Sequence, residues 1–258
     1  MSGDGLRQSS VSLFGPVMEA LVLAVPEVEA RTGRPVTLVG GLEVICRLGA
    51  AYRATSDLDT ANRRSPEQRP QLEILIASGA TPQGPSGVRI PTPRGEVQVD
   101  VLEVVDHELS ELPDDPTDRL HVMAHAWAVD SATPMLISVA GSEGSARPAT
   151  LRVRVASPGP LIAMKLQAIM NRPSSKEGTD LLDILRLTLD PAAGPTVREQ
   201  LQNASPQISH DAALHARRWF VDQRLRTLRQ INTAAVGEQV DLDTIDLVGD
   251  LLLGALEG

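Results

Sequence analysis

The spacing of apolar residues predicts a first half of the chain that mixes helices with strands. From Val11 to Val28 the apolar positions recur at helical intervals, and Gly33 and Pro35 mark the end of that segment. A short β-rich run stops at Gly40–Gly41, and helical spacing returns directly afterwards. By these criteria we predict helices at 11–31, 42–52, 67–77 and from 116 onward, and strands at 36–39, 88–91, 96–105, 135–139 and 151–155.

Two of these strands form a predicted hairpin with residues 92–95 as its turn. Its second arm alternates, with valines on one face and with Gln98 and Asp100 on the other. A Gly/Ser-rich turn is expected at 141–146, between the last two strands. The polar face of the hairpin therefore carries a carboxylate.

The second half of the chain follows the helical period almost throughout. The predicted helices are 160–171, 176–189, 196–204, 208–233 and 241–256. Because the pattern changes near residue 156, we predict an α+β protein with an α/β core over 1–156 and an all-helical lobe over 157–258.

Composition fits a globular protein and argues against a membrane protein. Hydrophobic residues make up 42% of the 258 residues but aromatics only 2%, so the core must consist of Leu, Val, Ile and Ala. No run approaches the roughly 18 apolar residues that span a bilayer, and residues 1–10 lack the features of a signal peptide. The single cysteine, Cys46, excludes an internal disulfide and is expected to be a small core residue. We therefore expect a cytoplasmic protein with no membrane partner.

Charge gives a second, narrower indication. The net charge of −9 argues against a surface coated with basic residues for nucleic acid, although a local basic groove is compatible with it. Of 24 basic residues only Lys165 and Lys176 are lysines, and they lie close together in the sequence. An ammonium is a compact point charge, so this placement suggests a specific role; chance placement is the alternative.

The segment from Gly40 to Asp59 carries the first candidate chemistry. A glycine pair before a helix lets backbone N–H groups face an anion, and the helix dipole favours negative charge there. Asp57 and Asp59 are two apart, so on a strand both carboxylates point the same way and are suited to Mg²⁺. Asp100, on the predicted hairpin, is a candidate third ligand. The alternative for Gly40–Gly41 is an ordinary strand-to-helix turn, and the alternative for Asp57 and Asp59 is a solvated loop. For Asp100 the alternative is an acid on the solvent-exposed face of a strand.

The second candidate segment contains both lysines. Pro160 opens a helix that presents Lys165, and a break at Pro173 leads to a second helix on which Lys176 and Asp180 share a face. A lysine that projects against the carboxylates would neutralise the charge of a bound triphosphate or orient its leaving group. A surface lysine with an i, i+4 ion pair is the alternative.

Together the two segments resemble the AbiEii family of bacterial nucleotidyltransferase toxins, which includes the mycobacterial MenT toxins. The family's Gly-Gly or Gly-Ser turn and Asp-Leu-Asp match Gly40–Gly41 and the run Arg53-Ala-Thr-Ser-Asp57-Leu-Asp59. Its later block, with Leu-x-x-Lys-Leu-x-Ala, an Arg, a Lys-acid pair and Asp-Leu, matches residues 161–181. The resemblance covers about residues 36–190. This chain departs from it at Gly41, where many relatives have serine, and at Glu177, where Asp is usual.

The resemblance implies a DNA-polymerase-β-like nucleotidyltransferase core that transfers a nucleoside monophosphate from an NTP and releases pyrophosphate. It implies that Asp57 and Asp59 hold Mg²⁺ and that Gly40, Gly41 and Arg53 bind the nucleotide. Lys165 would contact its phosphates, and Lys176 and Asp180 would complete the site. The acceptor implied by the MenT group is the tRNA 3′ end, and a cognate antitoxin protein is implied as a partner.

A tRNA acceptor requires a local basic surface, and the predicted helix at 208–233 offers one. Its arginines are Arg217, Arg218, Arg224, Arg226 and Arg229. They either follow a phosphate backbone or pair with the acidic helix at 241–256. Two other functions stay open: the same transfer to a small molecule or protein hydroxyl, and a non-catalytic binding protein. His121 and His125 are i, i+4 on a predicted helix but lack a third ligand by sequence, so we expect ordinary helix residues.

Overall fold

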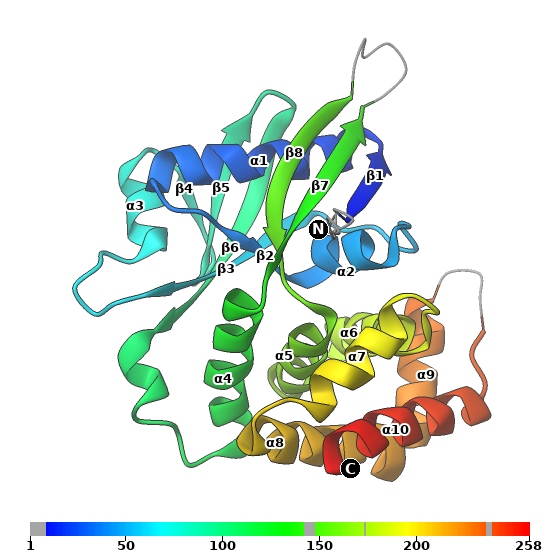
Figure 1. Cartoon of the computed structure of the whole chain (residues 1–258). Coiled ribbons are helices and arrows are strands. Elements are labelled where there is room, and N and C mark those ends of the chain that lie inside the picture. The colour runs from blue at the N-terminus through cyan, green and yellow to red at the C-terminus, as the bar shows by residue number, and fades with distance from the viewer. Residues whose placement is uncertain (1–8, 142–147, 173, 236–238) are drawn as a thin grey trace, which may run out of the picture. The chain divides into compact units, whose positions relative to one another are not determined.

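The computed structural model describes residues 9–141, 148–172, 174–235 and 239–258 (Figure 1). Most of the predicted turn at 141–146, and the predicted break at Pro173, lie outside these residues. The chain divides into two compact units. The sheet unit comprises residues up to 62, 68–103 and 132–156, and the helical unit comprises 63–67, 104–131 and 157–258. The chain thus passes between units at the predicted boundary near 156 and at four earlier points.

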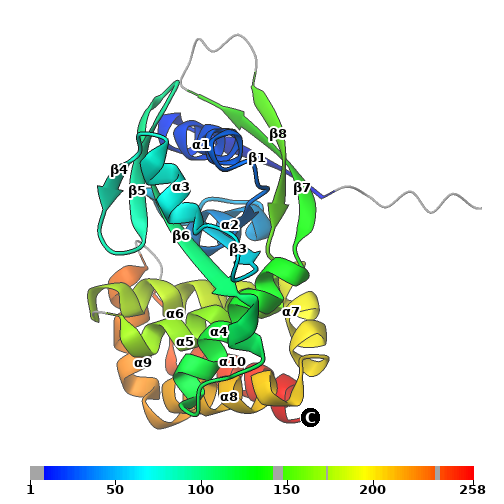
Figure 2. The same ribbon diagram turned by 90° about the vertical axis from the view of Figure 1, so that its left-hand side faces the viewer.

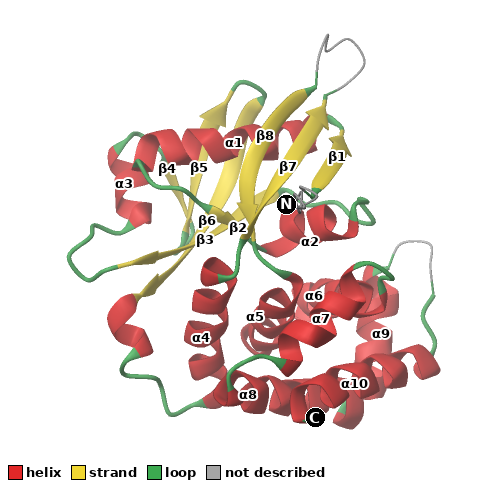
Figure 3. Cartoon of the chain, viewed as in Figure 1, coloured by secondary structure: helices red, strands yellow, loops and turns green. Residues whose placement is uncertain are grey.

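The described strands form one mixed eight-stranded sheet in the order β1-β7-β8-β2-β3-β6-β5-β4 (Figure 3). β1 pairs with β7, and β2 with β8, in parallel, whereas β7–β8, β2–β3, β5–β6 and β4–β5 are antiparallel. The strands are β1 (Ser10–Phe14), β2 (Thr37–Leu38), β3 (Asp57–Arg64), β4 (Thr81–Gln83), β5 (Gly87–Thr92), β6 (Gly95–Val105), β7 (Thr133–Ala140) and β8 (Ala149–Val155). The predicted α+β class with a mixed sheet is confirmed.

The helices described in the sheet unit are α1 (Pro16–Thr32), α2 (Gly40–Leu48) and α3 (Gln71–Ala77). The sheet curves around α1 and α2 (Figure 2). Leu21 and Val25 of α1 and Leu42 of α2 are buried in one aliphatic core with Leu58 and Val99 from the strands. An aliphatic core was expected from the scarcity of aromatic residues.

The predicted helix at 11–31 is wrong at its start. Residues 10–14 alternate between exposed and buried side chains, which is the two-residue period of a strand, and they form β1. Gly15 then adopts φ +103°, and Pro16 occupies the first position of α1, where its missing N–H costs nothing. Because apolar residues continue at helical spacing from Val17 onward, the prediction assigned the preceding strand to the same helix.

Two other helices are shorter than predicted, and one strand was not predicted. α2 ends at Leu48 because Gly49 takes the left-handed conformation, with φ +69°. α3 begins at Gln71, directly after Pro70. β4 contains only three exposed residues, so no apolar alternation marks it.

The helical unit contains the remaining helices. They are η1 (Asp106–Leu109), α4 (Pro116–Asp130), α5 (Pro158–Asn171), α6 (Ser174–Leu189), α7 (Ala193–Gln202), α8 (Pro206–Arg217), η2 (Arg218–Asp222), α9 (Arg224–Ala234) and α10 (Leu242–Glu257). α5 packs against α4, α6, α7 and α8 and is the central helix of the unit.

The single helix predicted at 208–233 is wrong. It is divided into α8, the π-helical turn η2 and α9, with Gln223 outside helical geometry at φ −111° and ψ 22°. In the π-helical turn the consecutive residues Trp219 and Phe220 both lie in the core, where they are 2% and 1% exposed. Two consecutive buried aromatics do not fit the one-sided pattern of a surface helix.

Within the described residues, no helix combines the length and the apolar character needed to cross a membrane.

Candidate functional site

The glycine turn lies at the junction of β2 and α2. Val39 is extended, and α2 begins at Gly40, whose φ of +73° is the left-handed conformation that favours glycine. A Cβ on Gly40 would lie 1.9 Å from Asp59 Oδ2. No other residue therefore fits at position 40 while the Asp59 carboxylate keeps its place.

The Asp57 and Asp59 side chains project from the start of β3. Leu58 between them is fully buried in the aliphatic core, so the two carboxylates point to the opposite face of the strand. Both are partly buried. The two carboxylates thus point the same way along β3, as the spacing of two predicted.

The third carboxylate comes from the neighbouring strand. β6 lies next to β3 in the sheet, and Asp100 alternates with the buried Val99 and Val101. One ligand oxygen from each of Asp57, Asp59 and Asp100 lies within 4.8 Å of the others. In the described part of the chain, this is the single cluster of acidic, histidine or cysteine side chains with metal-binding geometry.

Several neighbours fix the position of Asp100. Gln98 Nε2 donates to Asp100 Oδ1 at 3.1 Å, and the Thr60 hydroxyl on β3 donates to the Asp100 carbonyl at 3.2 Å. Gly87 on β5 is directly opposite Asp100 in the β5–β6 register. A Cβ on Gly87 would lie 2.4 Å from Asp100 Oδ1, so the carboxylate lies against a glycine.

Arg53 and Thr55 lie over the second glycine of the turn. A Cβ on Gly41 would lie 2.7 Å from Arg53 Nη2 and 2.9 Å from Thr55 Oγ1. Arg53 also donates to the Ala54 carbonyl at 3.0 Å, and its guanidinium lies 5.9 Å from the centroid of the Tyr52 ring. The structure therefore places a guanidinium, a hydroxyl and a bare turn together beside the carboxylates.

This donor set suits a hard divalent cation. Mg²⁺ prefers oxygen ligands and octahedral geometry, and three carboxylate oxygens within 4.8 Å of one another can share one ion. Partial burial weakens the screening of their mutual repulsion, which a cation between them would relieve. The residues present thus fit Mg²⁺, held by Asp57, Asp59 and Asp100.

Lys165 and Asp180 lie in the helical unit, in a buried ion-pair network. Lys165 Nζ is 2.8 Å from Asp180 Oδ1 and 2.6 Å from Asp183 Oδ2. Arg172 Nε lies 3.0 Å from Asp180 Oδ2. Burial alone would lower the pKa of Lys165, but the two carboxylates together raise that pKa above its usual value. Lys176, on the next helix, is exposed.

The arginines expected to form a basic surface are largely paired with acids. Arg217 binds Glu257 at 2.6 Å and Arg224 binds Asp246 at 2.8 Å, and both acids belong to α10. Arg226 binds Glu177 at 2.7 Å. The alternative in which these arginines pair with the acidic C-terminal helix thus holds for Arg217 and Arg224.

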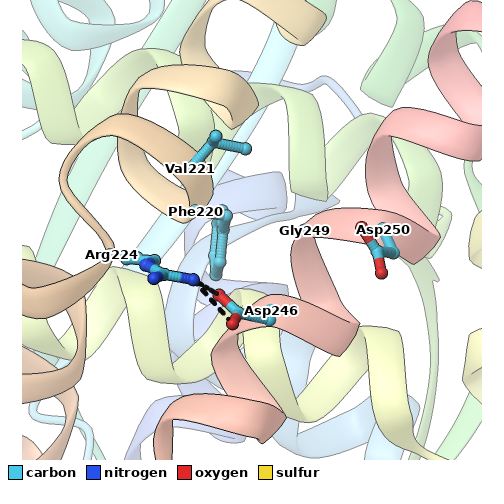
Figure 4. A pocket seen from close by; sticks show the side chains of 6 residues that line it. All are labelled: Phe220, Val221, Arg224, Asp246, Gly249 and Asp250. Atoms are coloured by element: carbon cyan, nitrogen blue, oxygen red, sulfur yellow. Dashed lines mark hydrogen bonds and ion pairs between the residues drawn. The ribbon is translucent and has the colours of Figure 1, made fainter.

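An open pocket of about 360 Å³ lies between η2 and α10 (Figure 4). Phe220 and Val221 form its apolar wall, and Arg224 donates to both carboxylate oxygens of Asp246 at its edge. Because that guanidinium is held by a carboxylate, the pocket offers an incoming anion little free positive charge.

The remaining titratable candidates show no catalytic arrangement. Burial, followed by the charge of Glu43, raises the pKa of the Cys46 thiol to about 12, which keeps it protonated and inert. The buried His125 ring bonds through Nδ1 to the His121 carbonyl at 2.6 Å. Among the described residues, neither histidine belongs to a group that could hold a metal.

Comparisons with known proteins give structural similarity without sequence similarity. No family model and no curated sequence matches the chain. One similar solved structure is an antigenic nucleotidyltransferase-like protein from Paracoccidioides brasiliensis, with 16% identity, a TM-score of 0.46, and coverage of 87% of this chain and 95% of that chain. Another is ANT(2")-Ia in complex with adenylyl-2"-tobramycin, with 15% identity, a TM-score of 0.38, and coverage of 77% and 96%.

Two residues of the site were missed by the sequence-based prediction, Thr55 and Gly87. Gly87 could have been predicted, because a hairpin turn at 92–95 places it directly opposite Asp100. Thr55 carries no comparable signal, since its proximity to Gly41 depends on how the loop before β3 folds back on the turn.

Proposed function

We propose that the protein is a Mg²⁺-dependent nucleotidyltransferase whose active site is the carboxylate cluster Asp57, Asp59 and Asp100. The observation that carries the proposal is the convergence of these carboxylates, from two adjacent strands, beside a glycine turn that opens a helix. A bound Mg²⁺ would neutralise charge on the transferred phosphoryl group.

The glycine turn and Arg53 bind the nucleotide in this proposal. The backbone N–H groups at the start of α2 would bind the triphosphate, because no side chain caps this helix end. The Arg53 guanidinium supplies a positive charge beside Gly41. The triphosphate is therefore held by backbone and guanidinium, and its α-phosphate faces the carboxylates.

The reaction is an in-line displacement. An acceptor hydroxyl oxygen forms a bond to the α-phosphorus of the NTP, the bond to the β-phosphate oxygen breaks, and pyrophosphate leaves. Asp100, which projects from a different strand than Asp57 and Asp59, accepts the proton of the attacking hydroxyl at a carboxylate oxygen.

For the acceptor we propose first the tRNA 3′ end, in line with the resemblance to the AbiEii and MenT toxins. In that role the protein is the toxin of a cytoplasmic toxin–antitoxin pair. Lys165, Lys176 and Asp180 keep the site roles that the resemblance implies for them.

A small molecule or protein hydroxyl is the second candidate acceptor, and one observation favours it. Arg217, Arg224 and Arg226 each pair with a carboxylate, which cancels much of the positive charge that a phosphate backbone requires. The net charge of −9 disfavours a nucleic-acid acceptor in the same sense.

The test incubates the purified protein with Mg²⁺, each of the four α-labelled NTPs and total tRNA. We expect wild type to transfer label and Asp57→Asn to lose at least a hundredfold in rate, because a neutral amide is a weak Mg²⁺ ligand. Asp243→Asn is the matched control, because Asp243 is an exposed acid on α10.

The label also distinguishes the acceptors. Label in tRNA supports the first candidate. Pyrophosphate release that requires a protein or small-molecule extract, with no label in tRNA, supports the second. Wild-type protein that neither releases pyrophosphate nor binds any Mg²⁺–NTP would overturn the proposal.

A further inference from the structure

Thr55 lies between the glycine turn and the first carboxylate of the site. Its side chain is buried, 6% exposed. The hydroxyl donates to Asp57 Oδ1 at 3.4 Å, and it would lie 2.9 Å from a Cβ on Gly41. One buried hydroxyl thus touches both parts of the site.

The burial of this hydroxyl constrains Asp57. A buried hydroxyl without a hydrogen-bond partner costs on the order of 1–3 kcal/mol, so Thr55 keeps its bond to the Asp57 carboxylate. The carboxylate is only partly buried and begins a strand, where solvent would otherwise allow it other rotamers. The bond therefore selects one orientation of the Asp57 side chain.

Gly41 provides the space for this arrangement. Any side chain at position 41 would meet the Thr55 hydroxyl and the Arg53 guanidinium at less than 3 Å. The bare turn therefore lets the segment 53–57 fold closely over the start of α2.

We propose that Thr55 is a positioning residue for metal binding, whose hydroxyl orients the Asp57 carboxylate toward Asp59 and Asp100. It is not itself a ligand and acts through Asp57. This inference rests on the proposed function, because it requires that the three carboxylates bind a divalent cation. Hydrogen-bond partners of metal ligands typically change metal affinity by about 10- to 100-fold.

The experiment measures Mn²⁺ binding to the full chain by electron paramagnetic resonance, without nucleotide. Mn²⁺ is a paramagnetic probe that shares the preference of Mg²⁺ for oxygen ligands. Thr55→Val keeps the shape of the side chain but removes the hydroxyl, and Thr55→Ser keeps the hydroxyl. Thr32→Val is the matched control, because the Thr32 hydroxyl bonds only within the end of α1 and the turn after it.

We expect Thr55→Val to raise the Kd for Mn²⁺ about tenfold, whereas Thr55→Ser and Thr32→Val stay within about twofold of wild type. An unchanged Kd for Thr55→Val would overturn the inference. Should Thr55→Val not fold, Thr55→Ala provides the same comparison, and a Kd equal to that of Thr55→Ser would overturn it equally.

Failure of this inference is distinguishable from failure of the proposed function. If Asp57→Asn lowers Mn²⁺ affinity but Thr55→Val does not, the carboxylate site stands and the role of Thr55 is wrong. If wild type and Asp57→Asn bind Mn²⁺ equally, the metal site itself is wrong, and the inference is overturned with it.

Discussion

At the scale of single residues, two of the three carboxylates owe their positions to glycines. Asp59 lies where a side chain on Gly40 would be, and Asp100 lies where a side chain on Gly87 would be. The two glycines differ in one respect. Gly40 also needs its left-handed φ of +73°, whereas Gly87 has an ordinary backbone and is required only for space.

Gly87→Ala is therefore expected to weaken metal binding. The new methyl would lie 2.4 Å from Asp100 Oδ1 and 2.7 Å from the Gln83 carbonyl, so the carboxylate must turn away and the backbone of β4 must shift. We expect the Kd for Mn²⁺ to rise about tenfold. Gly254→Ala is the control, because no atom lies within 4 Å of its added Cβ. Unchanged Mn²⁺ affinity in folded Gly87→Ala would contradict the steric role.

His125 is expected to make the folded state sensitive to acid. Burial, followed by the charge of His121, lowers the pKa of His125 from 6.5 to about 3. Between these two values the unfolded chain binds a proton that the folded chain excludes, so stability falls as the pH drops below about 6.5. The loss between pH 7 and pH 5 is about 2 kcal/mol.

Urea unfolding of wild type and His125→Leu at both pH values measures this effect. We expect the variant to lose less stability on acidification than wild type, while His210→Gln, at an exposed position of α8, behaves as wild type does. Equal acid sensitivity of His125→Leu and wild type would show that other groups dominate.

The carboxylate cluster was predictable from the sequence because it depends on alternation along strands. Asp57 and Asp59 share a face at a spacing of two, and Asp100 lies on the polar face of a hairpin with an evident turn. That β3 and β6 are neighbours, and that Thr55 folds over Gly41, depends on tertiary packing. Local sequence patterns do not predict tertiary contacts of this kind.

At the scale of elements, α5 and α6 are joined by buried charge. Lys165 and Asp183 are 5% and 0% exposed, and Asp180 is 3% exposed. Removing one partner of a buried ion pair leaves an uncompensated charge, which costs about 3–5 kcal/mol. Lys165 therefore has a structural function in the helical unit.

The two lysines of the chain form a matched pair for testing this. We expect Lys165→Met to reduce the free energy of unfolding by about 3–5 kcal/mol, because Asp180 and Asp183 lose their shared cation. Lys176→Met should change it by less than about 0.5 kcal/mol, since Lys176 is exposed. Urea unfolding followed by circular dichroism gives both values, and equal stability of the two variants would contradict the argument.

The sequence predicted helices better than it predicted their limits. Short apolar runs fit both a strand and a helix, which is why β1 was merged with α1. In the divided segment 208–233, Trp219 and Phe220 are both buried in the core, and the turn η2 that carries them packs against α9 and α10. Gly249 on α10 lies against Phe220, where an added Cβ would be 3.1 Å from the Phe220 Cβ.

At the scale of the whole molecule, the helical unit is assembled from separate parts of the sequence. Helix α4 lies before the last strands but belongs with the helices that follow them. Its buried side chains include Leu120 and Ala124, and α4 packs against α5 and α8. Arg119 of α4 binds the fully buried Asp211 of α8 through two bonds of 2.8 Å.

A fragment of residues 157–258 is therefore not expected to fold as the full chain does, although its sequence is almost entirely helical. Without α4 it exposes the apolar face of α5 and leaves Asp211 without its guanidinium. We expect retained helical circular dichroism, a broad urea transition and binding of a hydrophobic dye. Adding a peptide of residues 113–131, which carries α4 and Arg119, should sharpen the transition, whereas the same peptide with Arg119→Glu should not. A sharp transition in the fragment alone would show that the C-terminal helices form an independent domain.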